Sequence, residues 1–157
     1  MNLNLENFDE IATKGENLYN NFGFVKCPYL NDKVNFNTLG LEHLKFKKRG
    51  KARSRHDQYM RFKLINLAPE ILSSSHTLQG IWHTKHFERV RKNSRTENIL
   101  KEITFYEFLA VLENKRIKVI VKQIGDGEKF FWSLIPFWGI DKEKGRRKMF
   151  SGNPQVD

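Results

Sequence analysis

The stretch that decides the fold is VNFNTLGLEHLKFKKRGKARSRHDQYMRFKLINL, residues 34–67. Its first half predicts a helix through residues 38–48, which Thr38 caps and which ends before Gly50. Its second half predicts another helix, from about residue 57 to residue 67, because apolar side chains recur there at intervals of three and four residues. The side chains expected to face the core are Met60, Leu64, Leu67 and Ile71.

Positive charge is concentrated in the same stretch. The chain has 157 residues and a formal net charge of +10. Residues 45–63 contain nine lysines and arginines against one aspartate, a net charge of +8, whereas residues 1–32 contain five acidic and two basic residues. A dense block of cations favours a phosphate-bearing partner, because binding releases counterions. Scattered lysines that only keep a protein soluble would not form such a block.

The composition indicates one folded domain. Hydrophobic residues make up 39% of the chain and aromatic residues 13%, which is too much for a disordered segment. Cys27 is the single cysteine, so neither an internal disulfide nor a thiolate metal cluster can form. The first residues lack the pattern of a signal peptide, and no run is long enough to cross a membrane. We therefore expect a cytoplasmic protein without a membrane partner.

Outside the basic stretch, the chain predicts several strands. Residues 78–82, 103–112, 116–124 and 129–138 are rich in residues that favour strands, although 103–112 leaves a helix open. GDG at 125–127 predicts a tight turn between the last two strands, and residues 83–98 predict a long basic hairpin loop or flap. Pro136 predicts an edge or a bulge late in the last strand.

The expected fold class is α+β, with two N-terminal helices packed on one face of an antiparallel sheet of about four strands. Residues 1–33 would form an N-terminal arm and residues 34–140 the main domain. Residues 141–157 would form a basic, mobile tail.

Two side chains are candidates for chemistry or for core packing. His43 shares a helix side with Leu39 and Phe46, so it is either a packed core histidine or a proton-transfer group. Ser133 is expected to share one strand face with Phe131, Ile135 and Phe137, where its hydroxyl could bond to the backbone or contact a phosphate. Trp132 could stack on a base or pack in the core.

No metal site or cofactor is expected. The five histidines include one close pair, His83 and His86, without a neighbouring acid or cysteine to complete a ligand set. GDGEK lacks the pattern of a nucleotide-binding P-loop.

RNA cleavage without a metal ion needs few groups. The 2′-hydroxyl must lose a proton, the phosphorane must be stabilised, and the leaving 5′-oxygen must gain a proton. Histidine suits either proton transfer because its unperturbed pKa is near neutral, and arginine can hold two phosphate oxygens at once. Residues 34–67 supply His43, Lys45, Lys47, Lys48, Arg49, Arg53, Arg55, His56 and Arg61.

The order of the features resembles that of a known group of small nucleases. A strand near VNF, a helix with HLKFKKRG, the segment APEIL after a second helix, and a last strand KFFWSLIPFW occur in that order. This order is similar to that in the barnase–EndoU–colicin E5/D–RelE group, especially its phage- and mobile-element-associated branch. The resemblance covers about residues 34–138. It implies metal-independent RNA cleavage by a toxin or a phage-conflict effector.

The resemblance also implies site residues. His43 would be the helix histidine and Ser133 the late-strand hydroxyl, with Lys47, Lys48 and Arg55 as phosphate-binding cations. The basic insertion at residues 83–98 departs from the compact members of the group.

The sequence therefore predicts an endoribonuclease that acts by attack of the 2′-hydroxyl on the adjacent phosphate. The alternative is a non-catalytic module that binds nucleic acid or a protein partner. RNA is the expected partner, with tRNA or another structured RNA among the candidates, and a protein inhibitor is left open. The expected catalytic residues are His43, Arg55 and Ser133. The expected nucleic-acid-binding residues are Lys45, Lys47, Lys48, Arg49, Arg53, Arg61 and Trp132.

Overall fold

The computed structural model describes residues 5–112, 114–137, 140–141, 146–147 and 153–157. Its helices are α1 (Leu5–Phe22), α2 (Thr38–Lys45), α3 (Arg55–Leu64), the short 3-10 helix η1 (Ile65–Leu67) and α4 (Ala68–Ser74). Its strands are β1 (Phe24–Cys27), β2 (Asp32–Asn35), β3 (Phe46–Lys48), β4 (Lys51–Ala52), β5 (Gly80–Lys92), β6 (Arg95–Leu112), β7 (Lys115–Ile124), β8 (Lys129–Phe137), β9 (Ile140–Asp141) and β10 (Arg146–Arg147). No helix in these described ranges is both long and apolar enough to cross a membrane.

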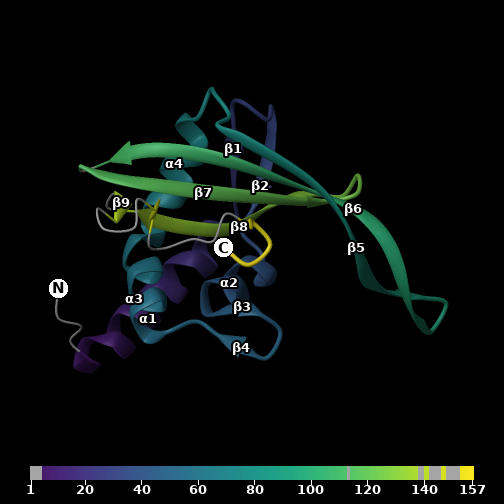
Figure 1. The fold of residues 1–157 in the computed structure, drawn as a ribbon, viewed down its shortest axis with the longest axis horizontal. Coiled ribbons are helices and arrows are strands. Elements are labelled where there is room, and N and C mark those ends of the chain that lie inside the picture. Colours follow the sequence, from purple (N-terminus) through teal and green to yellow (C-terminus); the bar gives the residue numbers. More distant parts are fainter. Residues whose placement is uncertain (1–4, 113, 138–139, 142–145, 148–152) are drawn as a thin grey trace.

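The main sheet has six strands in the order β1-β2-β8-β7-β6-β5 (Figure 1). The neighbours are antiparallel except β2 and β8, which run parallel and meet at Asn35 and Phe130. The fold is therefore α+β, as expected. The expected antiparallel sheet of about four strands is wrong, because β1 and β2 extend it to six strands and make it mixed.

The expected pair of N-terminal helices is also wrong, because the long helix α1 precedes α2 and α3. Residues assigned from the sequence to an N-terminal arm form α1, β1 and β2. The Tyr19 side chain of α1 is buried, and its hydroxyl donates to the main-chain oxygen of Asn37 over 2.6 Å. Of the expected tail, the structure describes residues 141, 146–147 and 153–157 only.

The basic stretch forms α2, a small hairpin and α3. The cap of α2 is Asn37 rather than Thr38, because the Asn37 side chain accepts a hydrogen bond from the Gly40 amide over 3.2 Å. The helix ends at Lys45, and the chain turns back between β3 and β4 through Gly50, whose φ is +77°. Ser54 then caps α3 by accepting from the Asp57 amide over 3.1 Å.

The helices cover one face of the sheet. Their buried side chains and one set of alternating strand residues form the larger core cluster. The predicted stripe of Met60, Leu64, Leu67 and Ile71 is confirmed as buried. A smaller cluster contains residues that alternate with this set on the strands, namely Ile103, Phe105, Ile120, Phe130, Trp132 and Ile135.

A bulge in β8 changes which side chains face the helices. Ile120 is paired with Ser133 and Val121 with Phe131, so Trp132 is the extra residue. Phe131 therefore packs in the larger cluster, whereas Ile135 packs in the smaller one. The expectation that Phe131, Ser133 and Ile135 share a face is wrong, because the extra residue shifts the alternation of the strand.

The strand predictions for residues 103–112, 116–124 and 129–138 are confirmed in position by β6, β7 and β8. β2 is paired with β8 at Phe130, several residues before Pro136. Pro136 is therefore not paired with β2, and its missing amide hydrogen costs no hydrogen bond to that strand. The expected basic flap at residues 83–98 forms the end of the β5–β6 hairpin, with Lys92 paired with Arg95.

Candidate functional site

The centre of the candidate site is a stacked pair of rings. His43 lies on α2 and is buried, and its ring stacks on Trp132 with centroids 3.9 Å apart and planes 17° apart. Gly40 brings α2 close to β8, since a side chain there would collide with the main-chain oxygen of Phe131. The ammonium of Lys122 lies 4.0 Å from the centroid of the Trp132 ring, a cation–π contact.

Arg53 holds His43 through two hydrogen bonds. Its Nε donates to the main-chain oxygen of His43 over 2.8 Å, and its Nη2 lies 2.9 Å from Nε2 of the His43 ring. A guanidinium can only donate, so Nε2 accepts this bond and the proton of the neutral ring lies on Nδ1. The imidazole is therefore held in one orientation and in one tautomer.

Arg61 lies on α3 and is fully buried beside Ser133. Its Nη1 donates to the Ser133 hydroxyl over 2.6 Å, and its Nε donates to Oδ1 of Asp57 over 2.6 Å. Asp57 also lies 3.5 Å from Nη1 of Arg53, so one carboxylate contacts both guanidinium groups. Asp157 is also buried, and its negative charge acts on both arginines, so the two guanidinium groups lie near two acidic residues.

Donors from three side chains converge on one oxygen of the chain itself. The main-chain oxygen of Asp157 accepts from Nη1 of Arg61 over 2.7 Å, from the Ser133 hydroxyl over 2.7 Å and from Nη2 of Arg53 over 3.1 Å. Nη2 of Arg61 is buried without a hydrogen-bond partner in the described part of the chain. The cluster thus resembles an oxyanion hole, with one further donor to offer.

The 153–157 segment covers this cluster. Pro154 accepts a hydrogen bond from Nε1 of Trp132 over 2.9 Å, and Val156 accepts one from Arg53 over 3.1 Å. A turn holds the segment in shape, because the main-chain oxygen of Asn153 accepts from the amides of Val156 and Asp157. In Figure 1 this segment, drawn in yellow, lies beside β8.

Burial and positive charge act together on the titratable groups. Burial lowers the pKa of His43 to about 2, and the charges of Arg53, Arg61 and Lys122 act in the same direction. Burial also lowers the pKa of Arg53 to about 10, and nearby Arg61 contributes, while Asp57 opposes the shift. The pKa of Arg61 is lowered by its burial as well. At neutral pH the imidazole is therefore uncharged, and both arginines stay cationic.

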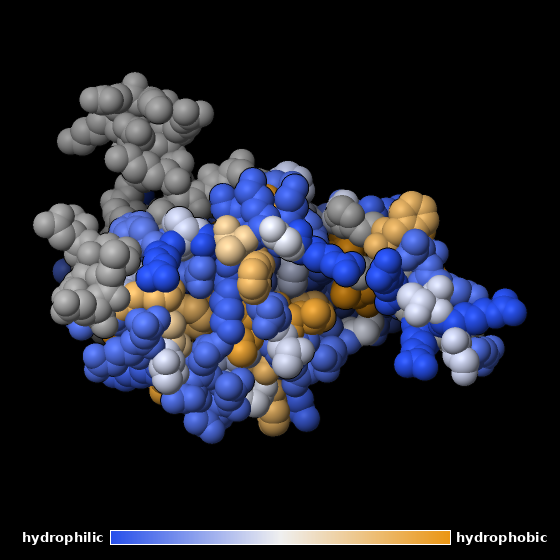
Figure 2. Space-filling model, turned by 90° about the horizontal axis from the view of Figure 1, so that it is seen from below, coloured by the Kyte–Doolittle hydropathy of each residue, from blue (hydrophilic) through white to orange (hydrophobic). Residues whose placement is uncertain are grey.

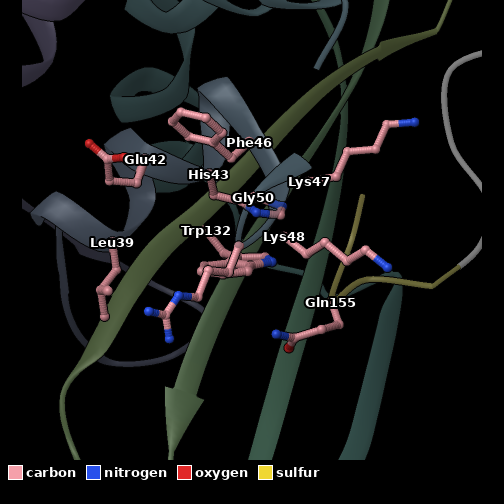
Figure 3. A pocket seen from close by; sticks show the side chains of 10 residues that line it. Leu39, Glu42, His43, Phe46, Lys47, Lys48, Gly50, Trp132 and Gln155 are labelled. Carbon is pink, nitrogen blue, oxygen red and sulfur yellow. The ribbon is translucent and has the colours of Figure 1, made fainter. Parts of the chain in front are cut away.

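An open pocket of about 470 Å³ adjoins the stacked rings. Figure 3 shows His43 against Trp132, with Lys48 and Gln155 beside them. The surface seen from the side of β3 and β4 is mainly hydrophilic, with apolar groups between the charged ones (Figure 2). The pocket is lined by Leu39, Glu42, His43, Phe46, Lys47, Lys48, Arg49, Gly50, Trp132 and Gln155.

The structure brings together some of the residues singled out in the sequence. His43, Arg53, Arg61 and Ser133 form one hydrogen-bonded cluster through the oxygen of Asp157. Trp132 stacks on His43, and the pocket beside them contains three of the predicted cations, Lys47, Lys48 and Arg49.

Two predicted residues have contacts elsewhere. The exposed Arg55 lies at the start of α3 with its guanidinium 5.4 Å from the ring centroid of Phe8. Lys45 forms an ion pair with Glu16 of α1. Arg53 and Arg61, rather than Arg55, lie in the hydrogen-bonded cluster with His43 and Ser133.

Three features of the cluster were not found from the sequence. Asp57 stands four residues from both Arg53 and Arg61, a spacing that predicts contact on a helix. In the sequence, Lys122 alternates with apolar residues of β7, which is the pattern expected of a lysine that faces solvent. The 153–157 segment has no sequence signal for its position.

The described residues contain no group of three or more histidine, cysteine, aspartate or glutamate side chains placed to hold a metal ion. Comparisons of this chain with family models, with curated proteins and with solved structures return no match.

Proposed function

We propose that this chain is a metal-independent endoribonuclease whose phosphate site consists of Arg53, Arg61 and Ser133. The observation that carries the proposal is the convergence of these three donors on one oxygen. Two guanidinium groups close to a single oxygen are expensive to bury unless negative charge is bound beside them. Asp57 and Asp157 provide negative charge in this structure, and a phosphodiester would replace the charge of Asp157 when RNA displaces the 153–157 segment.

A phosphate group suits this site because it offers several acceptor oxygens to the converging donors. The Asp157 oxygen stands in for one phosphate oxygen, and a phosphate has a second one for the buried Nη2 of Arg61. Bonds between a guanidinium and a phosphate are strong because both partners are charged, and one guanidinium can hold two phosphate oxygens. The 153–157 segment leaves the cluster when RNA binds.

His43 is proposed as the base. When Nη2 of Arg53 turns to the phosphate, Nε2 of His43 becomes available to accept the proton of the 2′-hydroxyl. Burial is the main cause of the low pKa of His43, and the cationic neighbours lower it further. A negative phosphodiester would offset the effect of these cations, and departure of the 153–157 segment would expose the ring, so both changes would make the imidazole more basic.

The proposed cleavage step is a displacement at phosphorus. The 2′-oxygen forms a bond to phosphorus as its proton passes to His43, and the two arginines stabilise the charge on the phosphorane oxygens. The bond between phosphorus and the 5′-oxygen breaks, and water from the pocket gives a proton to the leaving oxygen. The hydroxide that remains takes the proton from His43, which restores the neutral imidazole and the water. The products are a 2′,3′-cyclic phosphate and a 5′-hydroxyl.

The adjoining pocket is proposed to hold the neighbouring nucleotide. Lys47, Lys48 and Arg49 line it, and cations near the scissile phosphate would contact the flanking phosphates. The open side of the pocket admits a base next to Trp132, whose indole face is already used by His43.

A binding module without catalysis is the second candidate. It is favoured by the engagement of His43 Nε2 with Arg53 and by the low pKa of His43. This module would bind RNA in a salt-dependent way and release no product.

The test is incubation of the purified chain with tRNA and with total RNA in the presence of EDTA. Wild type should cleave, His43→Ala should be slower by about a hundredfold or more, and His56→Ala should match wild type. His56 is a suitable control because it is an exposed histidine on α3. Intact RNA after incubation with wild type would contradict the proposed cleavage and favour the binding module.

A further inference from the structure

The end of the β5–β6 hairpin is a two-stranded ribbon without a third strand. The ladder between β6 and β7 begins at Ile103, whereas β5 and β6 stay paired up to Lys92 and Arg95. A two-residue turn at Asn93 and Ser94, both with positive φ, joins the strands. Figure 1 shows this ribbon, residues 85–102, extending away from the rest of the sheet.

An exposed apolar pair lies in the middle of this ribbon. Phe87 is paired with Leu100 across the strands, and these residues are 71% and 52% exposed. A two-stranded ribbon alone is only marginally stable in water. Exposure of a large aromatic side chain to solvent does not stabilise the fold, and exposed apolar surface of this kind marks interaction sites. In Figure 2 the ribbon is the projection at the right, which carries hydrophilic and apolar surface.

Cations flank Phe87 on the same face. Lys85, Arg89 and Arg91 are exposed and lie at alternate positions of β5, so they point to the same side of the ribbon as Phe87. Their partners across the strands are Glu102, Asn98 and Thr96. The face therefore has three cationic groups and one acidic group around an aromatic ring.

We infer that this ribbon face binds single-stranded RNA that flanks the cleaved phosphate. Phe87 offers a surface on which a base can stack, and Lys85, Arg89 and Arg91 contact backbone phosphates. Stacking on an aromatic side chain with cations along the backbone is the usual way to bind a single strand without sequence preference. Charge complementarity favours a polyanion over a protein partner, because an apolar protein contact would not need three cations around the ring.

The inference rests on the proposed function, since RNA is taken as the substrate. Eight residues of a strand span about 27 Å, enough for several nucleotides of a single strand. A long RNA should therefore use both the ribbon and the Arg53–Arg61 cluster, whereas a short RNA can use the cluster alone.

The test measures binding of uncleavable 2′-O-methyl RNA to the full chain by fluorescence anisotropy. One probe has about 16 nucleotides and the other about 4 nucleotides. The variants are Lys85→Gln/Arg89→Gln/Arg91→Gln, and Phe87→Ala. The control is Lys14→Gln/Lys26→Gln/Lys63→Gln, which removes the same charge from exposed positions on other elements.

The variant Lys85→Gln/Arg89→Gln/Arg91→Gln should bind the long probe about tenfold more weakly than the control. The slope of the logarithm of its binding constant against the logarithm of the salt concentration should be smaller by about two than that of wild type. Phe87→Ala should bind the long probe more weakly than wild type, by about fivefold or more. Both variants should bind the short probe as wild type does. Equal binding of the long probe by the ribbon variant and the control, or by Phe87→Ala and wild type, would overturn the inference, and a protein partner would then be preferred.

This result is independent of catalysis, because the probes cannot be cleaved. Wild type that binds through the ribbon but leaves cleavable RNA intact would disprove the nuclease proposal and support the ribbon. If wild type cleaves RNA but the ribbon variants bind the long probe as well as their controls do, the nuclease proposal is supported and the ribbon inference is overturned. Circular dichroism of each variant checks that the sheet is intact.

Discussion

Nη2 of Arg53 lies 2.9 Å from Nε2 of His43, so a cation donates to an imidazole that burial already keeps neutral. The same nitrogen lies 3.1 Å from the main-chain oxygen of Asp157. One guanidinium group therefore contacts both the imidazole and the oxygen that the proposed phosphate would replace.

The first prediction concerns stability and pH. The pKa of His43 is about 2 in the folded chain, because the ring is buried, and about 6.5 in the unfolded chain, where the ring is in water. The unfolded state therefore binds more protons below pH 6.5, and the free energy of unfolding falls as the pH decreases through that value. Between pH 7 and pH 5 the contribution of His43 should fall by about 2 kcal/mol.

Urea unfolding of wild type and His43→Gln at both pH values measures this effect. Glutamine does not titrate, so the variant should lose most of the difference between pH 7 and pH 5. If the free energies of unfolding of both proteins depend on pH in the same way, the low pKa of His43 in the folded chain is contradicted.

The second prediction concerns Asp57, which contacts both arginines. Asp57→Asn leaves two buried guanidinium groups without their carboxylate and should reduce the free energy of unfolding by about 3 kcal/mol. Inorganic phosphate should raise the melting temperature of this variant more than that of wild type, because the anion replaces the lost charge. Glu70→Gln, at an exposed acidic position of α4, is the control and should respond to phosphate as wild type does.

The third prediction concerns competition between RNA and the 153–157 segment. Pro154→Gly/Val156→Gly makes this segment more flexible, so its ordered position on Trp132 and Arg53 loses stability. The double variant should therefore bind the short uncleavable RNA several-fold more tightly than wild type. Unchanged or weaker binding would mean that the segment does not compete with RNA.

The fourth prediction concerns the basic lining of the pocket. Lys47→Gln/Lys48→Gln/Arg49→Gln removes three cations that line it but leaves the buried cluster intact. KM for RNA should rise about tenfold and become less sensitive to salt, whereas kcat should stay within about twofold of wild type. Steady-state cleavage at two salt concentrations measures both constants. A large loss of kcat with an unchanged KM would place these residues in the chemical step.

Much of the fold was predictable because hydrophobic periodicity is local. The spacing of Met60, Leu64, Leu67 and Ile71 correctly indicated a buried helical stripe, and GDG at 125–127 correctly separated the last two strands. The short strands β1 and β2 were not predicted as part of the sheet. Their place depends on the parallel contact between Asn35 and Phe130, which are distant in sequence.

The candidate site was predictable only in part. His43 is buried although Leu39 and Phe46, which share its side of the helix in the sequence pattern, are exposed. Its main partner Trp132 is the extra residue of a bulge that no local pattern of β8 indicates. Arg53 and Arg61 had the same sequence signal as the exposed Arg55, because a run of cations does not reveal which of them a fold will bury. Only the tertiary contacts with Ser133 and Asp157 distinguish them.

The most direct test of the central claim uses a DNA oligonucleotide that contains a single ribonucleotide, incubated with the chain in EDTA. The account predicts one cut, with a 2′,3′-cyclic phosphate on one product and a 5′-hydroxyl on the other. Ser133→Ala should slow the cut, and a 2′-O-methyl group at the same nucleotide should prevent it. An intact ribonucleotide substrate, or equal cleavage of the 2′-O-methyl substrate, would contradict the claim that this cluster of arginines, serine and histidine cleaves RNA.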